Sequence, residues 1–165
     1  MIHVYIAKRD ENNTTSSIKL LEYTYFLENH KKIDISKIYK NSYGKPYYDD
    51  AFYYNISHSK HFIVIACSQS EVGIDIEEER TLSIDISRKI MTQDETIIDH
   101  NILNNWVIKE AYSKYLGMGF CYDFRKIPSN QLLNDSKLKK ISDPSFICYV
   151  YGEGDISKVE YVNLI

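Results

Sequence analysis

The sequence contains few cysteines and no long apolar run. The cysteines number three, Cys67, Cys121 and Cys148, and lie far apart, so no disulfide framework or cysteine metal site can be drawn. No apolar run approaches the length of a membrane-spanning helix, and the opening letters MIHVYIA lack the basic region and long apolar core of a signal peptide. We therefore expect no membrane association and a reducing, cytoplasmic location.

An excess of positive charge is also missing. The net charge is −3, and acidic and basic residues are interspersed, which argues against nucleic acid as a partner. With 165 residues, of which 44% are hydrophobic, the chain can bury a core as one domain or as two small subdomains that share it. Any phosphate group that the chain binds is expected to be held by a few local residues and not by a broad basic surface.

Carboxylates and isoleucines alternate in the segment GIDIE, residues 73–77. On an extended strand, Asp75 and Glu77 point to one face while Ile74 and Ile76 point to the other, toward a core. Gly73 has no side chain, which leaves room for a ligand to approach the backbone. The segment predicts a strand that presents carboxylates to a ligand.

The segment WVIKEAYSK, residues 106–114, is typical of a two-faced helix. Glu110 falls between two lysines on one broad arc, which is compatible with an ordinary surface Glu/Lys pair or with a site that holds cations and phosphates. The apolar stripe consists of Val107, Ile108, Ala111 and Tyr115, and the opposite arc of Trp106, Lys109, Glu110 and Lys114. The helix by itself leaves both interpretations open.

The remaining periodicity predicts a mixed α/β (α+β) chain. Residues 63–66, IVIA, are continuously apolar and predict a strand buried on both faces. Gly117 is expected to cap the helix that precedes it. The expected strands cover 1–7, 34–39, 52–56, 62–68, 72–77, 145–151 and 159–164, and the expected helices 18–30, 84–91, 94–99 and 104–116.

Four motifs follow one another along the chain: GKP at 44–46, NISHS at 55–59, GIDIE at 73–77 and WVIKEAYSK at 106–114. In this order they resemble the 4′-phosphopantetheinyl transferases, specifically the larger, monomeric surfactin-type class. The resemblance covers roughly residues 43–120, nearly half of the chain, and four ordered motifs are far more specific than any one of them.

The resemblance implies an α/β fold of two similar subdomains with pseudo-twofold symmetry, approximately residues 1–70 and 71–165, and a site in the cleft between them. It implies an enzyme that moves the 4′-phosphopantetheine arm of coenzyme A to a serine hydroxyl of an acyl or peptidyl carrier protein, releasing 3′,5′-ADP. It also implies Mg²⁺ as cofactor, with Mn²⁺ possible, and a monomer.

The resemblance assigns roles to individual residues. Asp75, Glu77 and Glu110 are expected to hold the metal, a hard cation that prefers carboxylates. Lys109 and Lys114 are expected to contact the pyrophosphate and the transferred phosphate, and Asp75 also faces the cofactor. Glu110 is in addition the candidate base for the incoming serine, a role that competes with metal binding because a bound cation lowers basicity.

The two earlier motifs are expected to bind the rest of coenzyme A. Ser57 and His58 match the family's phosphate contacts, with His58 near the 3′-phosphate, and the alternative is a turn that satisfies its own backbone. Lys45 and Pro46 match the loop beside adenine, for which a plain turn is the alternative. The letters GMGF at 117–120 are expected to border the pantetheine arm or the carrier protein, and Arg125 and Lys126 to add positive charge there.

The chain departs from the family in its N-terminal region. The stretch 8–38 is shorter than in surfactin-type members, and NNTTSS at 12–17 stands where cations for the 3′-phosphate are expected. Lys8, Arg9 and Lys19 are possible replacements, and spacing gives no reason to choose among them. The competing functions are a weak or inactive transferase-like protein that binds coenzyme A or a carrier, and a metal-dependent phosphoesterase.

Overall fold

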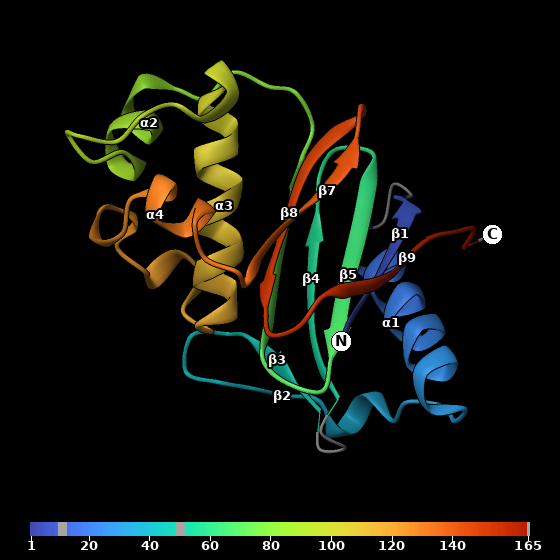
Figure 1. Ribbon diagram of the computed structural model, residues 1–165. Coiled ribbons are helices and arrows are strands. Elements are labelled where there is room, and N and C mark those ends of the chain that lie inside the picture. Colours follow the sequence, from blue (N-terminus) through green and yellow to red (C-terminus); the bar gives the residue numbers. More distant parts are fainter. Residues whose placement is uncertain (10–12, 49–51, 165) are drawn as a thin grey trace.

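The computed structural model describes residues 1–9, 13–48 and 52–164. Strands form its centre, α1 (Asn13–Asn29) covers one side, and α2 (Ile84–Ile90), α3 (Ile102–Tyr115) and α4 (Ser129–Leu133) lie on the other side (Figure 1). The mixed α/β class expected from the sequence is therefore confirmed. Short 3₁₀ turns occupy η1 (Ile35–Lys37), η2 (Ile98–His100), η3 (Gly119–Cys121) and η4 (Phe124–Lys126).

The first sheet has four strands in the order β4-β5-β1-β9. Its central strand β1 pairs antiparallel with β5 and parallel with β9. In the segment IVIA, Ile63 and Ile65 join a core with α1, whereas Val64 and Ala66 join the core toward the second sheet, so the predicted burial on both faces is confirmed. The strands are β1 (Ile2–Lys8), β4 (Tyr53–His58), β5 (Phe62–Ser68) and β9 (Ile156–Val162).

The second sheet has three antiparallel strands in the order β6-β8-β7. One face shares a core with the first sheet, and Tyr149 and Tyr151 of β8 pack against α3 on the other. Its strands are β6 (Val72–Glu77), β7 (Leu138–Asp143) and β8 (Phe146–Gly152), and a small separate hairpin joins β2 (Tyr39–Lys40) to β3 (Pro46–Tyr47).

The same connectivity occurs twice along the chain. In β1-α1-β4-β5 and again in β6-α3-β7-β8, the long helix follows the first strand, and the third strand pairs between the other two. This repetition is what two similar subdomains require. β9, however, returns from the C-terminal half to pair with β1, so the first sheet draws on both ends of the chain. The proposed subdomain boundaries stay a prediction.

Several predicted elements differ from the structure. α1 begins at Asn13, five residues before the expected start, because its first turns are polar and give no periodic signal. The helix expected over 94–99 is replaced by a turn and η2, where Asp99 and His100 have positive φ. β7 and α4 were not predicted, since one is a half-exposed edge strand and the other is a single short turn. The strand expected over 34–39 is mostly η1.

Among the residues that the structure describes, none of the helices has the length and apolar character needed to cross a membrane. Gly117 has φ +72° directly after α3, which confirms the predicted cap.

Candidate functional site

The candidate site lies at the seam where β4 of the first sheet runs beside β6 of the second. Here the buried amide of Asn55 accepts a hydrogen bond from the backbone N–H of Ile74 at 3.0 Å. This bond joins two strands that belong to different sheets and satisfies a buried donor. As a result, NISHS and GIDIE, far apart in the sequence, lie side by side.

Three side chains from three elements meet at this seam. Ser57 of β4 donates to Asp75 Oδ1 of β6 at 2.7 Å, and Lys114 Nζ of α3 donates to the same oxygen at 2.6 Å. Lys114 Nζ also lies 3.0 Å from Ser57 Oγ, so the three groups form a closed network. Asp75 is only 5% exposed, which strengthens a charge-assisted contact.

Gly73 allows α3 to approach β6 closely. A Cβ atom at this position would lie 2.1 Å from the Ala111 carbonyl oxygen and 2.3 Å from the Tyr115 nitrogen. The sequence suggested room for a ligand to approach the backbone at Gly73, but the backbone of α3 fills this space. The missing side chain therefore sets the distance between Asp75 and the lysine of the helix.

Glu110 points into the same buried region from α3. It is 1% exposed, and its Oε1 has no hydrogen-bond partner. Burial, followed by the negative charge of Asp75, raises the pKa of Glu110 to about 7, although Lys114 opposes the shift. Glu110 can therefore hold or release a proton near neutral pH, which suits a general base.

Lys114 balances the two acidic groups. Burial alone lowers the pKa of Lys114, but the nearby carboxylates of Asp75 and Glu110 outweigh it, so the pKa lies above the ordinary value. The side chain is 22% exposed and reaches the surface of the seam. It thus supplies a permanent positive charge where an anionic ligand can meet it.

The acidic groups partly suit a divalent cation. Asp75 Oδ2 and Glu110 Oε1 are both buried and unpartnered, and such oxygens are ligands that Mg²⁺ accepts. Glu77 pairs instead with Arg80, at 2.7 and 3.0 Å, and would have to release it to join them. Within residues 1–9, 13–48 and 52–164, no group of three or more His, Cys, Asp or Glu side chains is arranged to hold a metal.

Lys109 does not join this group. Its ammonium is fully buried and pairs with Glu95 Oε2 at 2.6 Å, while it also donates to the backbone carbonyls of Ile90 and Phe124. On a helix, positions 109 and 114 are about 140° apart, so the two lysines of the motif face different directions. The Lys109 ammonium is thus engaged by three partners within the protein, which contradicts the phosphate contact expected for it.

The Lys109–Glu95 pair instead stabilises the packing of neighbouring segments against α3. Glu95 Oε1 accepts hydrogen bonds from the Ser129 N–H at 2.7 Å and hydroxyl at 2.5 Å, and from Asn105 Nδ2 at 3.3 Å. Lysine pairing and these donors lower the pKa of Glu95 to about 2, against the opposing effect of burial. The pair connects three parts of the chain to α3: the segment that follows α2, the turn η4, and the start of α4. The spacing of the motif does not predict this structural role of Lys109.

His58 and Arg9 lie at one end of the first sheet. β5 begins with Phe62 and Ile63, whose partners are Lys8 of β1 and His58 of β4, so the ends of β1 and β4 meet there. Arg9 Nη1 donates to the Ser59 carbonyl at 2.7 Å, and its buried Nε has no partner. Partial desolvation, then the charges of Arg9 and Lys114, lower the pKa of His58.

Of the possible replacements named above, Arg9 donates a hydrogen bond to the NISHS turn, at the Ser59 carbonyl. Lys8, Arg9 and Lys19 together line a hollow of about 800 Å³, with Tyr161 and Val162. Among the residues that the structure describes, Arg9 has no carboxylate partner.

Lys45 is engaged within the protein. Its ammonium pairs with Glu71 at 2.5 Å and donates to the carbonyl oxygens of Val72 and Tyr115, at 3.1 and 3.3 Å. Burial lowers the pKa of Lys45, against the effect of Glu71. The side chain thus anchors the GKP loop to the end of α3.

The GKP loop also lines a small pocket beside Lys114. The pocket has a volume of about 170 Å³, and its walls come from the GKP loop, β4, α3 and the glycines that follow α3. Three of the four sequence motifs therefore border one space. Its lining consists of Tyr43, Gly44, Lys45, Pro46, Asn55, Lys114, Gly117 and Gly119.

The C-terminal part of the chain is similar in sequence to a known protein family. Residues 71–161, more than half of the chain, match the family model described as "4'-phosphopantetheinyl transferase superfamily". The transferase gsp of Aneurinibacillus migulanus is 38% identical over 89 residues, which are 48% of this chain and 38% of that protein. Sfp of Bacillus subtilis strain 168 is 26% identical over 120 residues, 66% of this chain and 53% of that protein.

A third relative is the transferase psf-1 of Bacillus pumilus, 28% identical over 109 residues, which are 61% of this chain and 47% of that protein. The matched part of the chain spans less than two thirds of each of these relatives. The family match nevertheless includes GIDIE and WVIKEAYSK, the motifs that supply Asp75, Glu110 and Lys114. The chain therefore belongs to the 4′-phosphopantetheinyl transferase superfamily and to its surfactin-type class.

Proposed function

We propose that the chain transfers the 4′-phosphopantetheine arm of coenzyme A to a serine hydroxyl of an acyl or peptidyl carrier protein. The serine oxygen forms a bond to the β-phosphorus of coenzyme A as the pyrophosphate P–O bond breaks. 3′,5′-ADP leaves with the electron pair of that bond. The observation that carries the proposal is the convergence of Ser57, Asp75, Glu110 and Lys114 at one seam.

Glu110 is the proposed base. With a pKa of about 7 it is partly deprotonated at neutral pH, and it can accept the serine proton directly or through a water. The burial that raises its pKa also keeps the reacting groups away from bulk water, which strengthens electrostatic effects in the site.

Lys114 is the proposed phosphate contact. Its charge is held at the surface of the seam by Asp75 and stands beside the small pocket. Negative charge grows on the leaving 3′,5′-ADP during phosphoryl transfer, and a fixed ammonium nearby stabilises it. Ser57 supplies a hydroxyl in the same network.

The far end of the cofactor is proposed to meet His58 and Arg9. The guanidinium of Arg9 is always charged and offers an unpartnered Nε, so it replaces the cations that the shortened N-terminal region does not provide. Pro46 and the backbone of the GKP loop are proposed to line the adenine, whereas the Lys45 ammonium acts within the protein.

We propose Asp75 and Glu110 as the ligands that would hold Mg²⁺, with Glu77 joining once it separates from Arg80. Glu110 acts as the base only when it does not ligate the ion, because a bound cation lowers its basicity. Mn²⁺ accepts the same ligands. When bound, the ion offsets the charge of the pyrophosphate. Cytoplasmic location and a monomeric state belong to the same proposal.

The test is an intact-mass measurement on purified apo carrier proteins of fatty-acid, polyketide and peptide synthesis. With coenzyme A and Mg²⁺, at least one carrier should gain the mass of one phosphopantetheine. No gain in any of them, with folded protein, refutes transferase activity. Calorimetry on the same sample identifies binding without turnover, and phosphate or phosphopantetheine released without a carrier identifies hydrolysis.

A further inference from the structure

The turn that joins β4 to β5 is held by a carboxylate from the end of the second sheet. Glu78 directly follows β6, and its Oε2 accepts hydrogen bonds from the Ser59 hydroxyl and from the His61 backbone N–H, both at 2.7 Å. The Nδ1 atom of the His61 ring lies 2.7 Å from Oε1 of the same carboxylate. These contacts of Glu78 with Ser59 and His61 are named the Glu78 clamp below.

The clamp extends the contact between β4 and β6 beyond the ends of both strands. Asn55, Ser57 and Ser59 alternate along β4 and the turn after it, and each has only 5% or 6% of its surface exposed. The links from Asn55 and Ser57 form the seam of the candidate site, and the link from Ser59 reaches Glu78. Because side chains two residues apart on a strand share a face, all three links lie on one side of β4.

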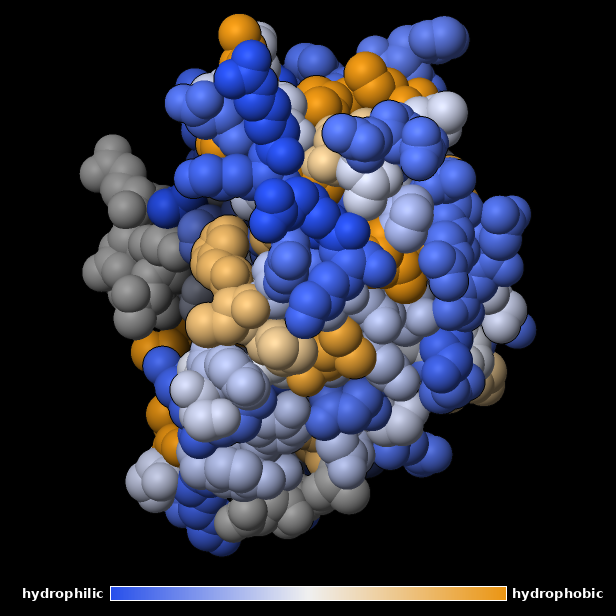
Figure 2. Space-filling model, turned by 90° about the vertical axis from the view of Figure 1, so that its left-hand side faces the viewer, coloured by the Kyte–Doolittle hydropathy of each residue, from blue (hydrophilic) through white to orange (hydrophobic). Residues whose placement is uncertain are grey.

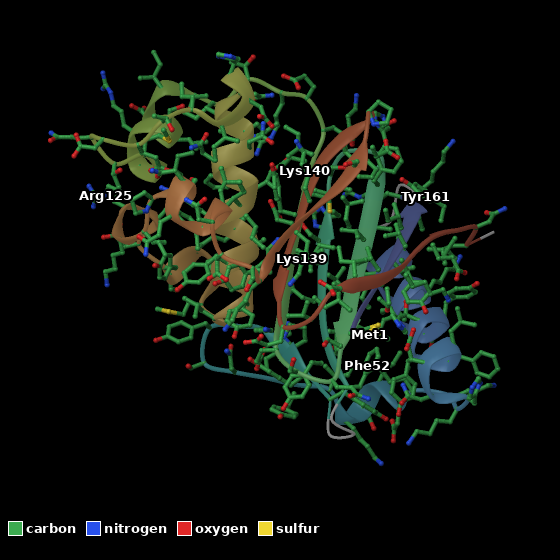
Figure 3. All side chains as sticks on the ribbon, viewed as in Figure 1. Met1, Phe52, Arg125, Lys139, Lys140 and Tyr161 are labelled. Carbon is green, nitrogen blue, oxygen red and sulfur yellow. The ribbon has the colours of Figure 1, made fainter. Side chains whose placement is uncertain are left out.

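The turn and the end of β6 lie together at the upper end of the sheets in Figure 1. Two side chains labelled toward this end in Figure 3, Lys140 and Tyr161, have partners elsewhere. Lys140 pairs with Asp99 at 3.1 Å, and the Tyr161 hydroxyl donates to Asp143. Neither of them therefore replaces Glu78 as a partner of the turn.

Arg9 binds the same turn from the end of β1. Its Nη1 donates to the Ser59 carbonyl at 2.7 Å, and its backbone N–H donates to the His61 carbonyl at 2.9 Å. The two turn residues thus give donors to Glu78 and carbonyl oxygens to Arg9. A shift of the turn therefore moves Arg9, and it also moves His58, which directly precedes Ser59.

The clamp depends mainly on one oxygen of Glu78. The His61 ring is 61% exposed, so its contact with Oε1 contributes little. The Ser59 hydroxyl is buried, and the Glu78 side chain is 20% exposed, which favours a strong hydrogen bond to the charged acceptor. The Ser59 hydroxyl and the His61 N–H, which both bind Oε2, therefore hold the turn.

We infer that Glu78 is a positioning residue, which holds the turn so that His58 and Arg9 are in place for the 3′-phosphate of the nucleotide before it binds. The inference rests on the proposed function, because it takes the 3′-phosphate to meet these two residues. The charge of Glu78 opposes this role, since a carboxylate near an anion weakens its binding. Loss of the charge alone would strengthen binding of the 3′-phosphate, whereas loss of the position weakens it.

The test is calorimetry with 3′,5′-ADP and 5′-AMP as probes, in the presence of chelator and without carrier protein. The two probes differ only in the 3′-phosphate, so the ratio of their affinities measures that contact. Glu78→Ala removes the clamp, whereas Glu78→Gln keeps an oxygen that can accept from Ser59 and His61. Two controls each remove a negative charge at an exposed position: Glu79→Ala beside the clamp, and Asp85→Ala on α2, on the helical face that Figure 2 shows.

Glu78→Ala should bind 3′,5′-ADP about tenfold more weakly than wild type, which is roughly the effect of losing one charge-assisted hydrogen bond, and should bind 5′-AMP equally well. Glu78→Gln should keep most of the preference, and neither control should weaken it. Ser59→Ala breaks one link and leaves the carboxylate charged, so it should lower the preference by a smaller factor. This variant decides the question if Glu78→Ala does not fold, as judged by circular dichroism.

An unchanged or increased preference for 3′,5′-ADP in the folded variants overturns the inference. Equal weakening of both probes also overturns it, because that is the result of a merely structural role. Equal affinity of wild type for the two probes contradicts the 3′-phosphate site and the inference together.

Transfer to a carrier protein is measured separately on the same samples. A selective loss of 3′,5′-ADP binding in Glu78→Ala, without transfer by wild type, supports the positioning role and refutes the transferase. Transfer by wild type, with an unchanged nucleotide preference in Glu78→Ala, refutes the positioning role and supports the transferase.

Discussion

Lys114 Nζ lies 2.6 Å from Asp75 Oδ1, so the cation of α3 balances a buried carboxylate of β6 across the seam between the sheets. The same ammonium is 3.0 Å from Ser57 Oγ of β4. The salt bridge and the Ser57 hydroxyl thus join three elements, and they also position the charge that the proposed reaction needs. Removal of the salt bridge should have separable effects on stability and on transfer.

Lys114→Met should lower both stability and activity. The variant leaves Asp75 buried without its cation, at a cost of about 3–5 kcal/mol in the free energy of unfolding, and it removes the proposed phosphate contact. Adding Asp75→Asn should recover most of the stability and none of the transfer. Urea denaturation and carrier-modification rates measure the two effects. Lys140→Met, at an exposed lysine on β7, is the matched control.

Binding of Mg²⁺ should strengthen as the pH rises. The metal needs the ionised carboxylate, and the pKa of Glu110 is about 7 in the protein without metal. Affinity should therefore rise about tenfold between pH 6 and 8 and then level off, with a proton released on binding. Calorimetry in buffers of different ionisation enthalpy measures both quantities. Glu110→Gln should bind weakly at all of these pH values, and an equal pH slope in that variant would assign the titration to another group.

The same pKa predicts the pH dependence of stability without metal. The folded state raises the pKa of Glu110 from 4.5 to about 7, so it binds the proton more tightly than the unfolded chain does. The free energy of unfolding should therefore fall as the pH rises through this interval and change little above it. Urea denaturation with chelator, from pH 4.5 to 8, measures the slope, and Glu110→Gln should remove it.

Breaking the buried pair of Lys109 and Glu95 should act on folding. Lys109→Met leaves Glu95, whose side chain has no exposed surface, without its cation and should cost about 3–5 kcal/mol. The double variant Lys109→Met/Glu95→Gln should be less destabilised than the single one. If Lys109 instead contacted phosphate, the folded single variant would show a large rise in the KM for coenzyme A. Chemical denaturation with steady-state kinetics separates these outcomes.

A side chain at Gly73 should be strongly destabilising. Gly73→Ala places a Cβ atom 2.1 Å from the Ala111 carbonyl, so α3 must move away from β6, at a cost of several kcal/mol, roughly the upper range for single substitutions. Gly152→Ala is the control, because its nearest contacts are 3.2 Å and it should cost less. Thermal unfolding compares them, and equal midpoints would contradict the close packing of helix and strand.

Arg9 should discriminate coenzyme A from its 3′-dephospho form. Arg9→Ala should raise the KM for coenzyme A about tenfold or more, because losing one charge-assisted hydrogen bond weakens binding by about that factor. The KM for the dephospho form should stay nearly unchanged. Lys19→Ala should affect neither. An Arg9 variant that loses affinity equally for both compounds would show that this residue does not bind the 3′-phosphate.

The sequence predicted the strands and helices whose residues alternate or repeat regularly. Asp75 and Glu110 could be singled out because their motifs combine period-two and helical patterns with charge. The order of motifs then indicated the family, which the comparison with known proteins confirmed. Pairing between the sheets through Asn55 and Ile74 could not be predicted, since it joins segments that carry no pairing signal.

Several residues have surroundings that the sequence could not predict. Lys109 and Lys114 belong to one motif, but a helix turns them apart, and only the packing of Glu95 shows which side Lys109 faces. Gly73 suggested an open approach because a sequence shows that a side chain is missing and not what fills the space. Phe120 was expected at the pantetheine arm or the carrier, and its exposure shows only in the folded chain.

The most direct test of the seam is the rate at which folded wild type, Asp75→Asn and Glu110→Gln add phosphopantetheine to one carrier protein, read by intact mass. We expect modification by wild type and a loss of at least about a hundredfold in both variants, each with a native circular dichroism spectrum. Wild-type rates in either folded variant would contradict the assignment of the reaction to this seam.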